Sequence, residues 1–221
     1  MPYLRAGNAN KKQMTVTSIA PTSKNAPAPA SDADLAIARR VLDIEATALR
    51  ELADSLNGDF CKAIDLIEGL KGRLVITGMG KSGHIAKKIA ATFASTGTPS
   101  FFVHPAEASH GDLGMIGKDD AVLALSNSGE TPELSDIIAF TRRFNVPLIG
   151  MTRKPESSLA KQSDCPLVLP ASPEACPNKQ APTTSTTAML ALADALAVTL
   201  MERRGFSADD FRTFHPGGKL G

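Results

Sequence analysis

From Arg73 onward, short uninterrupted apolar runs alternate with longer amphipathic segments. This rhythm is typical of a parallel sheet whose strands are buried on both faces and joined by helices. We expect an α/β fold, with a doubly wound five-stranded parallel sheet in a Rossmann-like three-layer sandwich. The predicted strands are 74–77, 100–103, 121–125, 147–151 and 166–169, and the predicted helices among and after them are 82–95, 132–144, 157–161, 183–204 and 208–211.

Two more helices are predicted ahead of the sheet. Ser31 and Asp34 form a capping-box pattern before a long stretch in which apolar residues recur at helical spacing, and a second helix follows Asn57-Gly58. Residues 1–30 carry basic but no acidic side chains and are rich in Ser, Thr, Ala and Pro, a composition that does not bury a core. We therefore expect a disordered extension over 1–30, with a transit peptide as the alternative, and one domain over 31–221.

The net charge and the cysteines limit the partners and the compartment. A formal charge of +1 gives no broad attraction for nucleic acid or an anionic membrane, so we expect a small-molecule partner. The three cysteines include no CxxC pair, which indicates a reducing compartment. We find no apolar run of the roughly 18 residues that a membrane span needs. The chain is therefore expected in the cytoplasm, bound neither to nucleic acid nor to a membrane.

The first predicted strand runs into a glycine-rich turn, Gly78–Gly83, which satisfies GxGxxG. A dinucleotide site also needs an acid about 20 residues further on, and no acid occurs between Gly78 and Glu107. A nucleotide P-loop needs a glycine at Val75, which disfavours ATP. What remains is the general ability of a helix N-terminus to bind an anion. Lys81 adds a cation where a helix start disfavours one, so we expect it to have a function.

The third predicted strand runs into a second turn, Ser126–Thr131, which is dense in hydroxyls and precedes a helix marked by Pro132. An ordinary helix cap would explain one hydroxyl but not the whole run. Hydroxyls and backbone amides suit a phosphate monoester. Glu130 and Glu133 complement the helix dipole, and at least one should point toward a sugar rather than its phosphate. The residues alone do not decide which one.

Five stretches carry a family resemblance: GMGKSGHIAKKIAATFASTGTPSFFVHPAEASHGDLG from Gly78, SNSGETPE from Ser126, EACP from Glu174, PTTSTTAMLALADALAV from Pro182 and HPGGKLG from His215. Together they resemble the sugar isomerase (SIS) domain, in particular that of the D-arabinose 5-phosphate isomerases. Many members continue past the last motif into a pair of CBS modules, so the resemblance is to the SIS domain without that pair. It covers most of residues 73–221.

The resemblance implies a cofactor-independent aldose–ketose isomerase that interconverts D-ribulose 5-phosphate and D-arabinose 5-phosphate. The product supplies Kdo for lipopolysaccharide biosynthesis. The implied catalytic residues are Lys81, Glu133, Glu174 and His215. The implied substrate contacts are Gly80, Ser82, Gly97, Thr98, His104, His110, Ser126, Ser128, Thr131, Pro170, Ala171 and Ser172. The resemblance also implies that His104 is an opportunistic ligand for inhibitory zinc, and that His215 reaches the pocket of a neighbouring subunit in a homo-oligomer, expected to be a tetramer.

Isomerisation needs a base for the carbon proton and an electrophile for the enediolate oxygen. Either Glu133 or Glu174 is assigned to the carbon proton, and His215 to ring opening. Two other functions stay open at this point. One is a non-catalytic SIS module that binds a phosphosugar effector, and the other is an isomerase of a different sugar phosphate.

Overall fold

The computed structural model describes residues 31–217, so the extension predicted over 1–30 lies outside the described residues. The sheet has five strands, all adjacent pairs are parallel, and the order is β2-β1-β3-β4-β5. The predicted fold class is confirmed, and each strand end lies within one residue of its predicted position. The strands are β1 (Leu74–Gly78), β2 (Ser100–Phe102), β3 (Ala121–Leu125), β4 (Leu148–Thr152) and β5 (Cys165–Val168).

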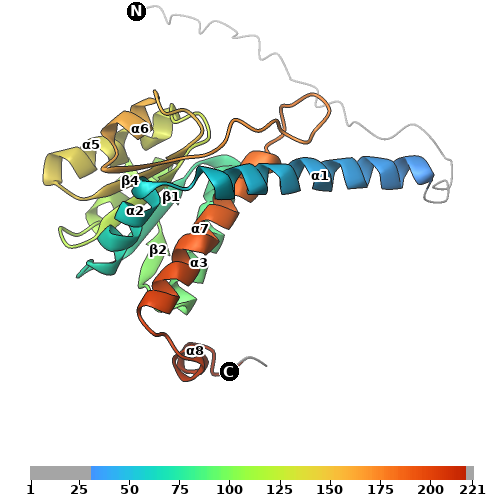
Figure 1. Ribbon diagram of the computed structural model, residues 1–221. Coiled ribbons are helices and arrows are strands. Elements are labelled where there is room, and N and C mark those ends of the chain that lie inside the picture. The colour runs from blue at the N-terminus through green and yellow to red at the C-terminus, as the bar shows by residue number, and fades with distance from the viewer. Residues whose placement is uncertain (1–30, 218–221) are drawn as a thin grey trace, which may run out of the picture.

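Helices cover both faces of the sheet, which gives three layers (Figure 1). One face packs against α1 (Asp32–Ser55), α2 (Gly58–Glu68), α3 (Gly80–Ser95) and α7 (Thr184–Arg203). The other packs against α4 (Pro105–Ala108), α5 (Ser135–Phe144) and α6 (Ser158–Gln162), with the 3₁₀ turns η1 (Asp112–Met115) and η2 (Pro132–Leu134). The last helix is α8 (Ala208–Phe214).

Strand β1 shows why continuous apolar runs predict such a sheet. Leu74 and Ile76 belong to the core cluster on the α3 and α7 side, whereas Val75 belongs to the cluster on the α5 side. Successive side chains of a strand point to opposite faces, so both must be apolar when both are covered. Gly83 lets α3 lie close to β1, because a Cβ atom there would stand 2.5 Å from the carbonyl oxygen of Gly78.

Several helical segments differ from their predicted bounds or were not predicted. The helix predicted over 132–144 starts as the 3₁₀ turn η2 before α5 begins at Ser135. Helix α8 continues to Phe214 rather than Phe211, after a capping box between Ser207 and Asp210. The short α4 and η1 were not predicted, since segments of four residues show no helical periodicity.

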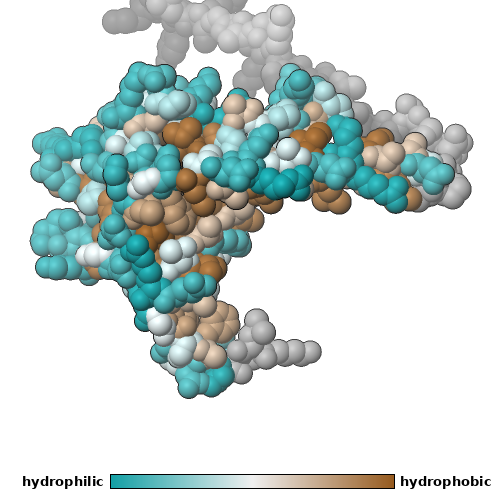
Figure 2. All heavy atoms as spheres, in the orientation of Figure 1, coloured by the Kyte–Doolittle hydropathy of each residue, from teal (hydrophilic) through white to brown (hydrophobic). Residues whose placement is uncertain are grey.

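Helix α1 begins at the predicted capping box, and Figure 1 shows its N-terminal half projecting beyond the sheet. Its buried residues are Ala48 and Leu52, both in the C-terminal half. Leu42, on the projecting half, is 65% exposed. Figure 2 shows hydrophobic residues gathered in the angle between α1 and α7. The domain thus leaves apolar surface uncovered beside these two helices.

Helix α7 bears on the expectation that the chain has no membrane span. It is 20 residues long and, by length and composition alone, apolar enough to cross a membrane, the single such helix among residues 31–217. Its buried side chains, which include Met189, Leu192 and Leu196, belong to the larger core cluster of the domain. Core helices of globular domains have the same composition.

Candidate functional site

The strand order places the switch point of the sheet between β1 and β3. The chain leaves β1 through α3 on one face and leaves β3 through α5 on the other. The two strands are in register to their ends, where Gly78 pairs with Leu125. Open parallel sheets bind ligands at the carboxyl edge of such a point. The glycine-rich turn and the Ser126–Thr131 turn therefore share the expected position of a site.

The glycine-rich turn gives α3 an open N-terminus. Gly80 has φ +58°, a left-handed conformation that favours glycine, and Met79 provides no side-chain cap. The first N–H groups of a helix lack partners within it, so they are available to an anion. Lys81 is exposed in this first turn. The Ser82 hydroxyl instead faces α7, 3.8 Å from the Met189 sulfur.

Hydroxyls hold the Ser126–Thr131 turn together. Ser126 is buried, its Oγ accepts a hydrogen bond from Gly129 N at 3.0 Å, and it lies 2.7 Å from Thr131 Oγ1. Ser128 is exposed, and its Oγ accepts from Glu130 N at 3.2 Å. Gly129 has φ +68°, and a Cβ atom there would overlap the Ser157 side chain. The turn is thus fixed before any ligand binds.

The two acids of this segment have different surroundings. Glu130 Oε1 accepts from Ser158 N at 2.7 Å, at the start of α6, and hydrogen bonding to Ser158 holds the pKa of Glu130 below its usual value. Glu133 is exposed in η2. Glu130 therefore has a structural task, and the catalytic role expected of Glu133 stays a prediction.

Glu174 is anchored at the start of α7. One oxygen, Oε2, accepts from Thr183 N at 2.7 Å, from Thr183 Oγ1 at 3.1 Å and from Ser185 N at 3.3 Å. Burial alone would raise the pKa of Glu174, but hydrogen bonding to the side chain and backbone of Ser185 and to Thr183 outweighs burial, and the pKa is lowered. A carboxylate of lowered pKa is a weaker base, and this one caps a helix.

The histidines after β2 have contrasting environments. His104 is half-buried and stands edge-on to Phe102, with ring centroids 6.1 Å apart. Its Nδ1 is buried and has no hydrogen-bond partner among the described residues, whereas His110 is exposed. In the part of the chain that the structure describes, no group of three or more His, Cys, Asp or Glu side chains could hold a metal ion. Zinc binding by His104 stays a prediction.

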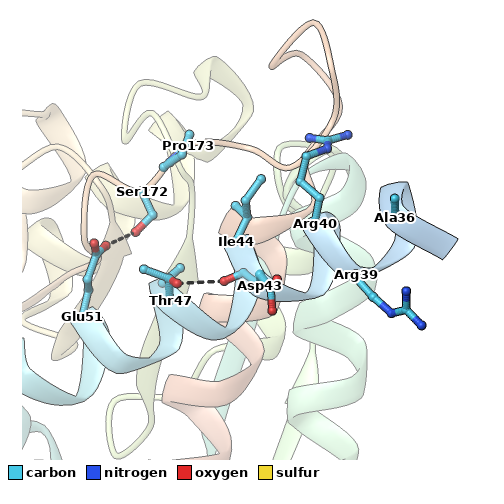
Figure 3. A pocket seen from close by; sticks show the side chains of 10 residues that line it. Ala36, Arg39, Arg40, Asp43, Ile44, Thr47, Glu51, Ser172 and Pro173 are labelled. Atoms are coloured by element: carbon cyan, nitrogen blue, oxygen red, sulfur yellow. Dashed lines mark hydrogen bonds between the residues drawn. The ribbon is translucent and has the colours of Figure 1, made fainter. Parts of the chain in front are cut away.

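Pro170, Ala171 and Ser172 follow β5 and lie beside α1. Ser172 Oγ donates to Glu51 Oε2 at 2.6 Å, and Figure 3 shows both side chains at one end of a groove of about 430 Å³ along α1. The segment after β5 therefore borders a helix that was not expected near the site.

A sequence model of the SIS domain matches residues 70–199. The chain belongs to the SIS domain family. It is 56% identical over 184 residues to arabinose 5-phosphate isomerase KdsD of Pseudomonas aeruginosa, and 54% identical over 183 residues to KdsD of Escherichia coli K12. Each match covers 83% of this chain but 56% of the relative, so the chain spans just over half the length of these relatives. A solved structure of E. coli CFT073 c3406 in complex with arabinose 5-phosphate is 43% identical, with TM-score 0.81, and the match covers 84% of this chain and all of that one.

The SIS domain does not bring every expected residue to the carboxyl edge. Leu74 N donates to Pro99 O, so the segment just before β2 lies at the opposite, amino edge of the sheet. There Thr98 is buried and accepts from Arg204 Nη1 at 2.8 Å. Gly97 has φ +89°, and a Cβ atom there would stand 2.7 Å from the Phe206 ring. Gly97 and Thr98 are separated from the two turns of the carboxyl edge by the length of a strand.

His215 lies at the same corner of the SIS domain. It follows α8, stacks on Phe211 with ring centroids 3.9 Å apart, and its Nδ1 is 2.8 Å from the Phe211 carbonyl oxygen. Phe214, one residue earlier, stacks with Phe206, which packs at Gly97. Figure 1 shows α8 at the far end of α7 from α1. In this chain, His215 does not join the residues of the carboxyl edge.

Sequence reasoning missed two residues of this region. Arg153 directly follows β4, and its backbone N–H donates to Asn127 O at 3.2 Å, inside the Ser126–Thr131 turn. A signal was available, because the position just after a parallel strand is a standard place for ligand contacts. Glu51 had none, since it sits 121 residues from Ser172 in the sequence.

Proposed function

We propose that the SIS domain interconverts D-ribulose 5-phosphate and D-arabinose 5-phosphate, moving the carbonyl between C1 and C2 through an enediolate without a cofactor. The observation that carries this proposal is the identity of 54–56% to proteins named arabinose 5-phosphate isomerase, over a stretch that contains both turns of the switch point. We further propose that the product supplies Kdo for lipopolysaccharide biosynthesis and that the enzyme works in the cytoplasm.

The phosphate of the substrate is proposed to bind the Ser126–Thr131 turn. The fixed conformation of this turn supports the assignment, because a pre-organised site loses little freedom when it binds. The exposed Ser128 hydroxyl and the backbone amides supply donors. The open N-terminus of α3 and Lys81 stand at the same switch point and add positive charge for an oxygen of the phosphate or the enediolate.

Glu133 is proposed to carry the proton between C1 and C2. The alternative, Glu174, holds three hydrogen bonds at the start of α7 and has a lowered pKa, both of which suit a fixed anion better than a proton carrier. Glu174 is then proposed to support catalysis by fixing α7 and its charge beside the sugar.

A homo-oligomer, expected to be a tetramer, is proposed to complete each site. Gly97, Thr98 and His215 gather at one corner of the subunit through contacts of Arg204 and Phe206, away from their own switch point. A neighbour's site would receive all three together, with His215 serving ring opening. The uncovered apolar surface between α1 and α7 supports subunit association (Figure 2).

One experiment tests the activity directly. The purified chain is incubated with D-ribulose 5-phosphate in deuterated water, and the aldose and deuterium at C2 are followed by NMR. We expect both to appear. A folded chain that binds the sugar phosphate without forming aldose or exchanging deuterium would instead be an effector-binding module, and turnover of only another sugar phosphate would change the substrate assignment.

A further inference from the structure

Two buried side-chain oxygens beside the Ser126–Thr131 turn have no hydrogen-bond partner among the described residues. They are Asn127 Oδ1, in the turn itself, and Thr184 Oγ1, in the first turn of α7. Both residues line the same small cavity. Buried polar atoms nearly always have a partner, and leaving one without a partner is costly. Two such oxygens around one space indicate that a polar group belongs there.

The helix cannot satisfy the Thr184 hydroxyl by itself. A Ser or Thr inside a helix commonly bonds to a carbonyl oxygen three or four residues earlier, as Thr186 Oγ1 does to Thr183 O at 2.8 Å. Thr184 stands at the first position of α7, so the residues three or four places before it lie outside the helix. Thr184 is only 2% exposed, so bulk water does not replace the missing carbonyl.

The cavity has room for about one oxygen. Its volume is about 10 Å³, which is close to the least that holds a single water molecule. Arg153 also lines it and can donate N–H groups, and Ala188 and Leu169 close it with apolar surface. A phosphate group is therefore too large, whereas a single hydroxyl fits.

The cavity adjoins the proposed phosphate site. Asn127 belongs to the phosphate-binding turn, and its carbonyl oxygen is bonded to the Arg153 backbone. On the other side, Ser172 and Ala48 line both this cavity and the groove along α1 (Figure 3). A sugar phosphate held by the turn thus has a polar, one-oxygen recess next to it.

We propose that this recess binds one non-reacting hydroxyl of the sugar and makes the enzyme specific for it; the inference rests on the proposed isomerase function. A hydroxyl both donates and accepts, so it can donate to Asn127 Oδ1 and accept from Arg153 or Thr184. A carbonyl oxygen cannot donate, and an anion would leave the Asn127 oxygen unsatisfied. A sugar that lacks this hydroxyl would leave the buried oxygens unpaired, which is the condition for strong rejection of an analogue.

The test compares substrate analogues in matched variants. Thr184→Val removes one oxygen while keeping the shape, and Thr186→Val is the control, because the Thr186 hydroxyl bonds within the helix. The value of kcat/KM is measured with D-ribulose 5-phosphate and with its 3-deoxy and 4-deoxy analogues. We expect the wild type to reject one analogue at least ~100-fold, Thr184→Val to reject it about tenfold less strongly, and Thr186→Val to behave as the wild type.

Two outcomes overturn the inference while leaving the isomerase function intact. In the first, the wild type turns over all three substrates equally well. In the second, Thr184→Val lowers kcat/KM by the same factor for each substrate. Either result would mean that the recess holds only a structural water. If the wild type turned over none of them, binding would be measured instead. Calorimetric Kd values for arabinose 5-phosphate and its 2-, 3- and 4-deoxy analogues would be compared between wild type and variants, with the same expected ratios. Thr184→Ala replaces Thr184→Val if that variant does not fold.

Discussion

Replacing Glu174 by glutamine is expected to destabilise the domain at neutral pH, and the loss should fade in acid. The substitution keeps the size of the side chain but removes the negative charge that faces the start of α7. In the wild type, Glu174 Oε2 receives three hydrogen bonds, two from Thr183 and one from the Ser185 backbone. An amide oxygen at this position still accepts hydrogen bonds, although it does so without charge.

The magnitude follows from those contacts. A helix N-cap stabilises a protein by about 0.5–2 kcal/mol, and a hydrogen bond to a charged group contributes about 1.5–3 kcal/mol. Because glutamine keeps an acceptor, we expect Glu174→Gln to lower the free energy of unfolding by about 1–2 kcal/mol at pH 7. For a domain of this size, that corresponds to a Tm lower by about 2–8 °C.

The pH dependence has a definite sign. The pKa of Glu174 in the folded chain lies below its ordinary value of 4.5. Its carboxylate therefore stabilises the fold above pH 4.5, and that stabilisation disappears as the pH falls from 4.5 through the lowered pKa. The difference in Tm between wild type and Glu174→Gln should be full at pH 7 and should shrink below pH 4.5.

The measurement is thermal unfolding followed by circular dichroism, repeated at about six pH values between 3.5 and 7. Glu107→Gln is the matched control, since Glu107 is exposed in α4 and its loss should change Tm by no more than about 1–2 °C. Equal Tm values for Glu174→Gln and wild type at pH 7 would refute the capping role. A Tm difference that stays constant down to pH 3.5 would refute the role of the charge.

Other outcomes are expected at the proposed active site and the turn beside it. Glu133→Gln and His215→Asn should each lower kcat at least ~100-fold, with sugar phosphate binding retained. If sites are shared between subunits, co-refolding the two variants should restore about a quarter of the wild-type activity. No recovery of activity would place His215 outside a neighbour's site. Lys81→Met should weaken sugar phosphate binding about tenfold and reduce its salt dependence, measured by calorimetry at two ionic strengths; an unchanged Kd would leave Lys81 without a binding role. Gly129→Ala should lower the free energy of unfolding by about 1–3 kcal/mol, and Tm by several degrees, because of the left-handed φ of residue 129 and the overlap with Ser157. A Tm equal to that of the wild type would contradict the tight packing.

The strands were predictable because burial of a strand determines the type of consecutive residues in the sequence. Residues 121–125 are apolar without a break since both faces of β3 are covered, and that requirement shows in five consecutive residues. The turns after β1 and β3 were predictable for the same reason, because each directly follows such a run. The short α4 had no comparable signal.

Contacts between distant segments were not predictable in this way. The resemblance grouped Gly97 and Thr98 with the other substrate contacts, and only the fold shows that they lie at the amino edge, tied to Arg204 over more than 100 residues of sequence. The contacts of Glu174 were not predictable either, because its partners depend on how the loop folds back to α7. Nothing local predicts which distant backbone amide a carboxylate will meet.

Helix α7 also fixes the distance between the two edges of the sheet at which its ends make contacts. Its first turn carries the recess residues and receives Glu174, while the residue after its last turn, Arg204, holds Thr98 at the opposite edge. Its 20 residues span about 30 Å at 1.5 Å per residue. In a homo-oligomer that shares sites, this helix would act as the spacer between the site that a subunit keeps and the site to which it contributes. Inserting one residue would turn one end by about 100° relative to the other, so the length of α7 should be among the least variable dimensions of the assembly.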